Sequence, residues 1–346
     1  MRAYLDHNAT TPLRPEAREA MLRAMDLVGN PSSVHAEGRM AKSVVEAARA
    51  QVAAALGAEG ADVIFTSGAT EAAALALAGR ELHGAEIEHE AVAAWADTGL
   101  AVDRNGLVTV DDPARSTLQL ANSETGVIQS LPEGLAVSDM TQGFGKLPLA
   151  FNWSGCTMAL VSAHKLGGPK GIGALVVKRG TDLAAQLRGG GQEQGRRAGT
   201  ENIIGIAGFG AAAEAAALEL AQGAWHRVAE LRNILEKTIE AAAPDTIFLG
   251  RDVPRLPNTS CIATPGWKGE TQVMQMDLAG FAISAGSACS IGKVRASRVL
   301  RAMGYDDDVA SGAIRVSLGV QTTEDDVLRF ADIWLDKRRK YAARAA

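Results

Sequence analysis

Apolar residues recur at helical spacing over three long parts of the chain. Residues 16–28 and 41–56 are rich in alanine, with apolar positions three and four residues apart, and Gly29 and Gly57 stand where these helices should end. A longer Ala/Leu/Glu pattern covers residues 203–242, which is enough for two helices or one very long one. Gly and Glu interrupt its apolar part, so we expect no membrane span there.

Short apolar runs of the kind found in buried strands lie between these stretches, at residues 62–66, 117–121, 135–139, 158–162 and 172–177. Turn signals or helical patterns separate them, which predicts a mostly parallel sheet covered by helices. Beyond residue 242 the pattern predicts shorter strands and two helices, at residues 246–249, 260–263, 281–284, 294–303 and 324–345. We interpret this last third as a second, smaller α+β domain.

Composition narrows the class of protein. A chain of 346 residues is long for one core, so two domains are expected. The net charge is −5 and the Lys and Arg residues form no dense stripe, which argues against nucleic acid as the main partner. The first residues show no secretory signal, and three cysteines cannot form a disulfide framework. We expect a cytoplasmic protein, with no membrane and no metal.

The most informative segment is residues 158–173. The apolar run ends in Ser162, His164 and Lys165, and a glycine-rich turn follows. In α/β folds, ligands bind at the carboxyl ends of strands. An amine there can form an imine with a carbonyl cofactor while its polar neighbours hold an anion. A surface lysine leaving a strand is the alternative interpretation.

A second strand, at residues 62–66, runs into a turn of small residues and then a helix. Such a turn presents backbone N–H groups and the hydroxyls of Ser67 and Thr70 at a positive helix N-terminus, which suits a phosphate. Ordinary helix capping is the alternative. Asp139 ends the run at 135–139 and could pair with a protonated ring nitrogen, or cap the next turn. His89 could stack on a flat ring, or be an ordinary core or surface histidine.

The chain resembles a cysteine desulfurase of the class V aminotransferase family, which are fold-type I enzymes that use pyridoxal 5′-phosphate (PLP). The matching stretches follow the order of that family over nearly the whole chain: residues 4–12, 29–33 with His35, 65–71, 88–92, 122–126, 139–143, 145–148, 164–165, 168–175, 189–193, 197–200, 284–289, 299–304 and 314–319. The resemblance implies a large PLP-binding domain at residues 12–222. It implies a small domain made of residues 1–11 and 223–346.

The same resemblance implies a role for each matching residue. Lys165 forms the imine with PLP, Asp139 pairs with the pyridine nitrogen, His89 stacks on the ring and Gln142 faces the phenolic oxygen. Phosphate ligands are Ala69 through its backbone, Thr70, Ser162 and His164, with Thr200 supplied by the partner subunit of a homodimer. Arg315 binds the substrate carboxylate, because a guanidinium can donate two parallel hydrogen bonds to it. Asn8 is a second substrate-binding residue. Cys289, on a loop of small residues, supplies the nucleophile; Lys165, Cys289 and His89 are the predicted catalytic residues.

Removal of sulfur from L-cysteine needs a thiolate to attack the substrate sulfur, which leaves alanine and a persulfide on Cys289 for a sulfur-acceptor protein. This serves iron–sulfur cluster or thio-cofactor synthesis. Cys156 and Cys261 are expected to be buried and inert. The chain departs from the family at Ser123, where a cofactor-contacting Asn is usual; we expect Ser123 to bind the cofactor through a shorter hydrogen bond. Its C-terminus is short. Alternative functions are a selenocysteine lyase, a class V transaminase, or a PLP-binding partner subunit without turnover.

Overall fold

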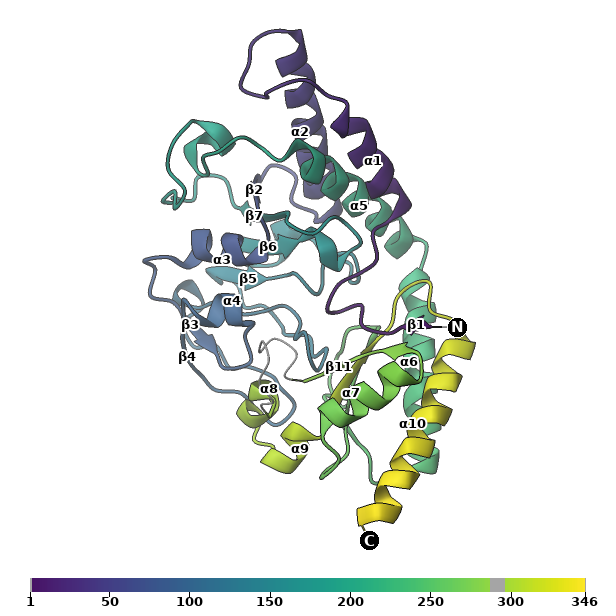
Figure 1. Ribbon diagram of the computed structural model, residues 1–346. Coiled ribbons are helices and arrows are strands. Elements are labelled where there is room, and N and C mark those ends of the chain that lie inside the picture. The colour runs from purple at the N-terminus through teal and green to yellow at the C-terminus, as the bar shows by residue number, and fades with distance from the viewer. Residues whose placement is uncertain (1, 287–295, 346) are drawn as a thin grey trace.

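The computed structural model describes residues 2–286 and 296–345, and a four-stranded sheet lies at the centre of its larger part (Figure 1). The strand order is β2–β7–β6–β5, with bounds Asp62–Thr66, Gly173–Val177, Met158–Ser162 and Val137–Asp139. β7 is antiparallel to both neighbours, whereas β5 and β6 are parallel. Two strands predicted from the sequence, at residues 62–66 and 158–162, have the observed bounds.

The segment at residues 117–121 was expected to be a strand, and this prediction is wrong in detail. It lies beside β5 and runs parallel to it, and Leu118 N donates to Val137 O at 3.1 Å. Leu120 N likewise donates to Asp139 O at 2.8 Å. On the opposite edge, toward residues 83–85, Thr117 N donates to His83 O (2.8 Å), but Gln119 N donates to the Glu88 carboxylate (2.7 Å), so regular backbone pairing ends there.

Single bridges continue the sheet from there to β3 (His83–Ala85), which pairs in parallel with β4 (Asp97–Leu100). Among the described residues of this sheet, β7 alone is reversed. The predicted mostly parallel sheet is therefore confirmed.

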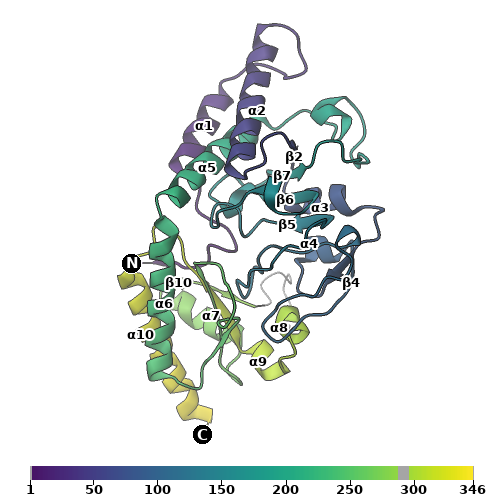
Figure 2. The same cartoon turned by 180° about the vertical axis from the view of Figure 1, so that it is seen from behind.

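Helices cover both faces of the sheet (Figures 1 and 2). One layer is α1 (Pro15–Met25), α2 (Ala36–Ala55) and α5 (Ile203–Ala221), and the other is α3 (Ala69–Leu77) and α4 (Glu90–Ala93). Side chains of a strand alternate between faces, so Val63 and Phe65 pack with the first layer and Ile64 with the second. α5 is long and apolar enough to cross a membrane by length and composition alone, but it packs against α1 and α2 as a core helix.

The second helix starts earlier than the pattern indicates. α2 begins at Ala36 and not at residue 41, because the side chain of His35 accepts a hydrogen bond from Gly38 N (3.3 Å) and caps the helix. Sequence rules look for Ser, Thr, Asp or Asn at that position, so this cap was missed. α1 ends at Met25, three residues before the predicted end. The long pattern at residues 203–242 forms two helices, since Gly223 between α5 and α6 (Ala224–Ala242) has a φ of 78°.

A second sheet, with strand order β11–β12–β9–β8, is antiparallel throughout. Its strands are Ser284–Ala285, Ala313–Ser317, Thr259–Ala263 and Ile247–Leu249. One face packs against α6, α7 and α10, and the other against α8 and α9. Helices α7 (Gly269–Leu278), α8 (Arg298–Ala302), α9 (Asp307–Ser311) and α10 (Glu324–Ala345) complete this part. The short 3₁₀ helices are Pro113–Arg115, Phe151–Trp153, Ala163–Lys165 and Gln192–Gly195.

The N-terminal segment joins the two parts of the molecule. β1 (Ala3–Tyr4) pairs in parallel with β10 (Phe281–Ala282), and Asp6 is bridged to Ser317 in β12. The chain then crosses to the larger part, where Thr11 N donates to His164 O at 2.8 Å. Residues 7–11 therefore lie between the two hydrophobic cores, beside the ends of β5 and β6.

Candidate active site

A cavity of about 650 Å³ opens at the carboxyl ends of β5 and β6, between the two parts of the molecule. It collects every predicted site residue except two: Asn8, Ala69, Thr70, His89, Ser123, Asp139, Gln142, Ser162, His164, Lys165 and Arg315. The exceptions are Thr200 and Cys289. Thr200 is exposed and lines a neighbouring hollow that shares Ser67 and Gly171 with the cavity. Cys289 lies outside the described residues.

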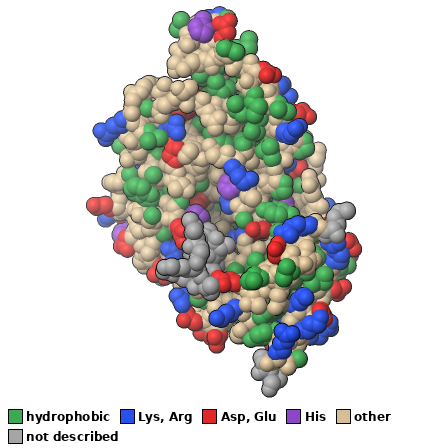
Figure 3. Space-filling model, in the orientation of Figure 1, with side chains coloured by type: hydrophobic (Ala, Val, Ile, Leu, Met, Phe, Trp, Pro, Cys, Tyr) green, Lys and Arg blue, Asp and Glu red, His purple; other side chains and the backbone are tan. Residues whose placement is uncertain are grey.

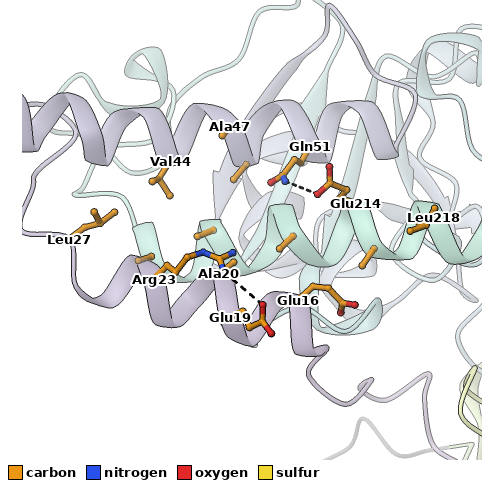
Figure 4. Close-up of a pocket in the computed structure, with 15 residues that line it drawn as sticks. Glu16, Glu19, Ala20, Arg23, Leu27, Val44, Ala47, Gln51, Glu214 and Leu218 are labelled. Carbon is orange, nitrogen blue, oxygen red and sulfur yellow. Dashed lines mark hydrogen bonds and ion pairs between the residues drawn. The ribbon is translucent and has the colours of Figure 1, made fainter.

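A second hollow of the same volume, about 650 Å³, lies between α1, α2 and α5 (Figure 4). Its walls are mostly alanine and leucine side chains, and four of its five polar residues interact in pairs: Arg23 with Glu19, and Gln51 with Glu214. Volume alone therefore does not identify a functional site. The first cavity is identified as the candidate site because titratable groups converge on it at the ends of strands.

Lys165 follows β6 directly and reaches back to the N-terminal segment. Its Nζ donates to the backbone oxygens of Asn8 (2.7 Å) and Ala9 (2.8 Å). The side chain is only half-buried and lines the cavity, so the amine is held within reach of a ligand. The apolar run at 158–161 predicted a lysine just after a strand end, and the structure places Lys165 there.

The turn before α3 fits a phosphate group. Among the described residues, the N–H groups of Ala69 and Thr70 have no acceptor at this helix N-terminus. Gly173 of β7 lets the turn approach closely, because a Cβ there would lie 2.8 Å from Gly68. Glu71 fixes the turn by accepting hydrogen bonds from Ser67 N (2.7 Å) and Arg197 Nε (2.8 Å).

His164 is an uncharged hydrogen-bonding group at this site. Burial, and then the charges of Lys165 and Lys170, lower its pKa to about 4. Its Nδ1 lies 3.1 Å from Thr10 Oγ1. Lys165 and Lys170, which line the cavity, also give it a positive field, which favours an anionic ligand such as a phosphate monoester. The residues present therefore fit the phosphate of PLP.

Asp139 and His89 face the same cavity from different elements. Asp139 ends β5; its Oδ1 accepts Thr141 N at 2.9 Å, while Oδ2 has no protein partner among the described residues. His89 caps α4, where its Nδ1 accepts Ala91 N at 3.1 Å, so its ring proton is assigned to Nε2. A carboxylate oxygen and an imidazole ring are thus both presented to a ligand in the cavity.

Arg315 reaches the cavity from β12, and its guanidinium already makes two hydrogen bonds within the protein. Its Nη2 donates to Asp6 Oδ1 (2.7 Å) and its Nη1 to the backbone oxygen of Ser123 (2.9 Å). Its Nε is buried without an acceptor in the described part of the chain. Ser284 Oγ also donates to Asp6 (2.8 Å). Asp6 therefore orients the guanidinium and leaves Nε for another acceptor.

Asn8 makes all the hydrogen bonds that its side chain can make. Its Nδ2 donates to Ser123 O (3.2 Å) and Thr259 Oγ1 (2.8 Å), and its Oδ1 accepts from Lys146 Nζ (3.2 Å) and Asn258 Nδ2 (3.0 Å). An amide offers no further donor or acceptor than these. The predicted contact of Asn8 with a substrate is therefore not available to its side chain in this arrangement, where Asn8 links three segments around the site.

Sequence reasoning missed several residues of the cavity wall and its support: Asp6, Thr10, Gln119, Lys146 and Lys170. Three of these residues lie inside the stretches that match the family: Asp6, Lys146 and Lys170. Nothing in their spacing indicated which of them would face the site. Cys156 and Cys261 are buried, and burial raises the pKa of both thiols, which confirms that they are packing residues.

Comparison with known proteins identifies the family. Residues 3–330 match the class V aminotransferase family. The chain is 40% identical to a cysteine desulfurase of Cereibacter sphaeroides, with 96% of this chain and 94% of the relative covered. It superimposes on the crystal structure of a NifS-like protein from Rickettsia africae with a TM-score of 0.88 at 30% identity, covering 97% of this chain and 99% of the other.

A third match is the structure of SspA in complex with cysteine, with a TM-score of 0.76 and 26% identity over 93% of this chain and 100% of the other. These matches confirm the predicted fold type and PLP, the coenzyme of the family, as the cofactor. With the family match spanning nearly the whole sequence and the lysine, carboxylate and phosphate turn gathered in one cavity, this chain belongs to the class V aminotransferase family.

Proposed function

We propose that this protein is a cysteine desulfurase that converts L-cysteine and the thiol of Cys289 into L-alanine and a Cys289 persulfide. The observation that carries the proposal is the convergence of Lys165, Asp139 and Arg315 on one cavity. Full-length relatives named cysteine desulfurase, 36–40% identical to this chain, support it.

When bound, PLP supplies a carbonyl carbon that amines can attack and a ring that withdraws electrons from the attached substrate. The residues around the cavity would hold it in three places. Ala69, Thr70, Ser162 and His164 would bind the phosphate, Asp139 Oδ2 would hold a proton at the ring nitrogen, and His89 would cover one face of the ring. Lys165 would supply the attacking amine and move protons near the substrate Cα.

The substrate would be oriented by its carboxylate. The unpartnered Nε of Arg315 and its Nη groups offer charge-assisted hydrogen bonds, and Asp6 keeps the guanidinium in place. The Cys289 thiolate would then attack the substrate sulfur. The carbon–sulfur bond breaks, its electron pair stays on carbon, and a proton completes alanine, so atoms and electrons balance.

We further propose that the protein is a homodimer in which Thr200 of one subunit serves the phosphate site of the other. The exposure of Thr200, and its place outside the cavity of its own chain, support this. Sulfur would pass from the Cys289 persulfide to an acceptor protein, and the reducing cytoplasm would keep the Cys289 thiol reduced between turnovers. Positive and negative side chains are intermingled on the face shown in Figure 3.

Product analysis tests the proposal. The purified protein, loaded with PLP, is incubated with a reductant and either L-cysteine or L-selenocysteine, and alanine and the sulfide or selenide released are measured. We expect the two products in equal amounts. A keto acid in place of alanine would indicate a class V transaminase, a strong preference for selenocysteine a selenocysteine lyase, and no product a partner subunit without turnover. Each of these outcomes would contradict the proposed function.

A further inference from the structure

Lys146 is a buried lysine for which the mechanism above has no role. It is 2% exposed and does not line the cavity. Gly145, with a φ of 76°, turns the chain just before it, next to Ala216 and Leu166. In the described part of the chain its Nζ has two hydrogen-bond partners, Gln142 Oε1 at 2.7 Å and Asn8 Oδ1 at 3.2 Å. No carboxylate pairs with it there.

These contacts determine which way the amide of Gln142 points. Its Nε2 donates to the backbone oxygen of Asn8 (2.9 Å), and its Oε1 accepts from Lys146. The backbone oxygen of Asn8 can only accept and so requires Nε2, while the amine of Lys146 donates to Oε1; the two neighbours are therefore satisfied together only in this orientation. The second hydrogen on Nε2 has no acceptor among the described residues, and Gln142 lines the cavity.

We propose that Lys146 is a positioning residue that fixes the amide of Gln142 with its NH₂ group toward the cofactor cavity. Without Lys146, Oε1 would lose its donor, and the amide could rotate and present an oxygen to the cavity. An oxygen there would repel the phenolic oxygen of PLP, whereas the NH₂ group donates to it. The inference rests on the proposed function only in taking PLP as the group that Gln142 faces.

The surroundings of Lys146 suit this role. Burial, and then the charges of Lys165 and Arg315, lower the pKa of Lys146 well below its ordinary value. A neutral amine has two hydrogens, and Lys146 has two acceptors, so the uncharged form satisfies both without an unpaired buried charge. Lys146 thus orients Gln142 at a smaller desolvation cost than a permanent cation would have.

The test is a double-mutant cycle read out by PLP binding. The dissociation constant of PLP is measured for the purified wild-type protein and for Lys146→Met, Gln142→Leu and the double variant, together with the thermal midpoint of each apo protein. Since Lys146 acts through Gln142, we expect each single change to weaken PLP binding about tenfold, and the double variant to be no weaker than Gln142→Leu. Val52→Ala, a change in a fully buried residue of α2 away from the cavity, is the control for lost stability.

A role in packing alone predicts a different result. Lys146→Met would then lower the thermal midpoint as Val52→Ala does, with an unchanged dissociation constant, and that result would overturn the inference. The inference would also be overturned if the effects of the two single changes on the dissociation constant multiplied in the double variant. If the wild-type protein bound no PLP, that result would contradict both the proposed function and this inference.

Gln142→Glu gives a second test that does not depend on how well Lys146→Met folds. It keeps an oxygen for Lys146 but replaces the NH₂ group by another oxygen. We expect PLP binding to weaken at least as much as in Gln142→Leu. Wild-type affinity in Gln142→Glu would mean that the amide presents its oxygen to the cavity, which contradicts the proposed orientation.

Discussion

Glu88 should make the folding stability of this protein fall as the pH rises through neutrality. Its side chain is 1% exposed; Oε1 accepts Gln119 N at 2.7 Å, and Oε2 is buried with no partner in the described part of the chain. Burial raises the pKa of Glu88 from 4.5 to about 8, with a smaller contribution from the charge of Asp139. Between these two pH values the folded protein holds a proton that the unfolded chain has released.

The sign and size of the effect follow from proton linkage. Because the folded state binds more protons in this window, stability decreases with increasing pH, by at most about 1.4 kcal/mol per pH unit. From pH 5.5 to 7.5 this gives a loss of about 2.5 kcal/mol from this one group. Glu88→Gln removes the titration and keeps an acceptor for Gln119 N. The variant and the wild type should be within about 1 kcal/mol of each other at pH 5.5.

The assay is urea unfolding of the apo proteins at half-unit steps from pH 5.5 to 8.5, analysed as the difference between Glu88→Gln and wild type. The difference removes the contribution of other groups, such as Glu124, whose pKa burial raises to about 7. Glu90→Gln, on an exposed residue of α4, is the matched control. A stability difference that stays constant across this range would refute the reasoning.

Three further predictions concern the site and the loop beside it. Lys165→Ala should abolish the imine absorption of bound cofactor, and borohydride reduction of the wild type should place the pyridoxyl mass on the Lys165 peptide; finding it on Lys146 or Lys170 would contradict the assignment. Asp139→Asn should keep the thermal midpoint but lower kcat roughly 100-fold, by analogy with loss of one preorganised electrostatic group, and near-normal kcat would make Asp139 a structural cap. Glu193→Ala should lower the free energy of unfolding by about 1–3 kcal/mol, since Phe65 N loses its acceptor and Arg49 its buried partner but keeps Glu46; a loss below about 0.5 kcal/mol in urea unfolding would refute this.

The sequence was sufficient where one local signal determined the structure. Continuous apolar runs predicted β2 and β6, and the lysine after β6 was placed correctly at the site. Helix α7 was missed because Gly269–Leu278 begins with glycine and shows no clear apolar stripe, although Met276 and Gln272 are buried. Gln272 is satisfied there by Trp334 and by backbone oxygens, which only the folded structure reveals.

The support of the site could not be predicted because it depends on contacts between distant segments. Asn8 joins Lys146 to Asn258, across separations of 138 and 250 residues. Likewise, the pairing of Asp6 with Arg315 joins positions 309 residues apart. Motif spacing identifies which residues are polar at strand ends, but the partners of buried polar groups are set by tertiary packing.

The central claim is that sulfur leaves cysteine by attack of the Cys289 thiol. The most direct measurement is mass spectrometry of the peptide that contains Cys289 after the PLP-loaded protein has reacted with L-cysteine without reductant. The account predicts a mass increase of one sulfur on Cys289, and no alanine from Cys289→Ser even though that variant still binds PLP and cysteine. Extra sulfur on Cys156 or Cys261, or alanine formed by Cys289→Ser at the wild-type rate, would contradict it.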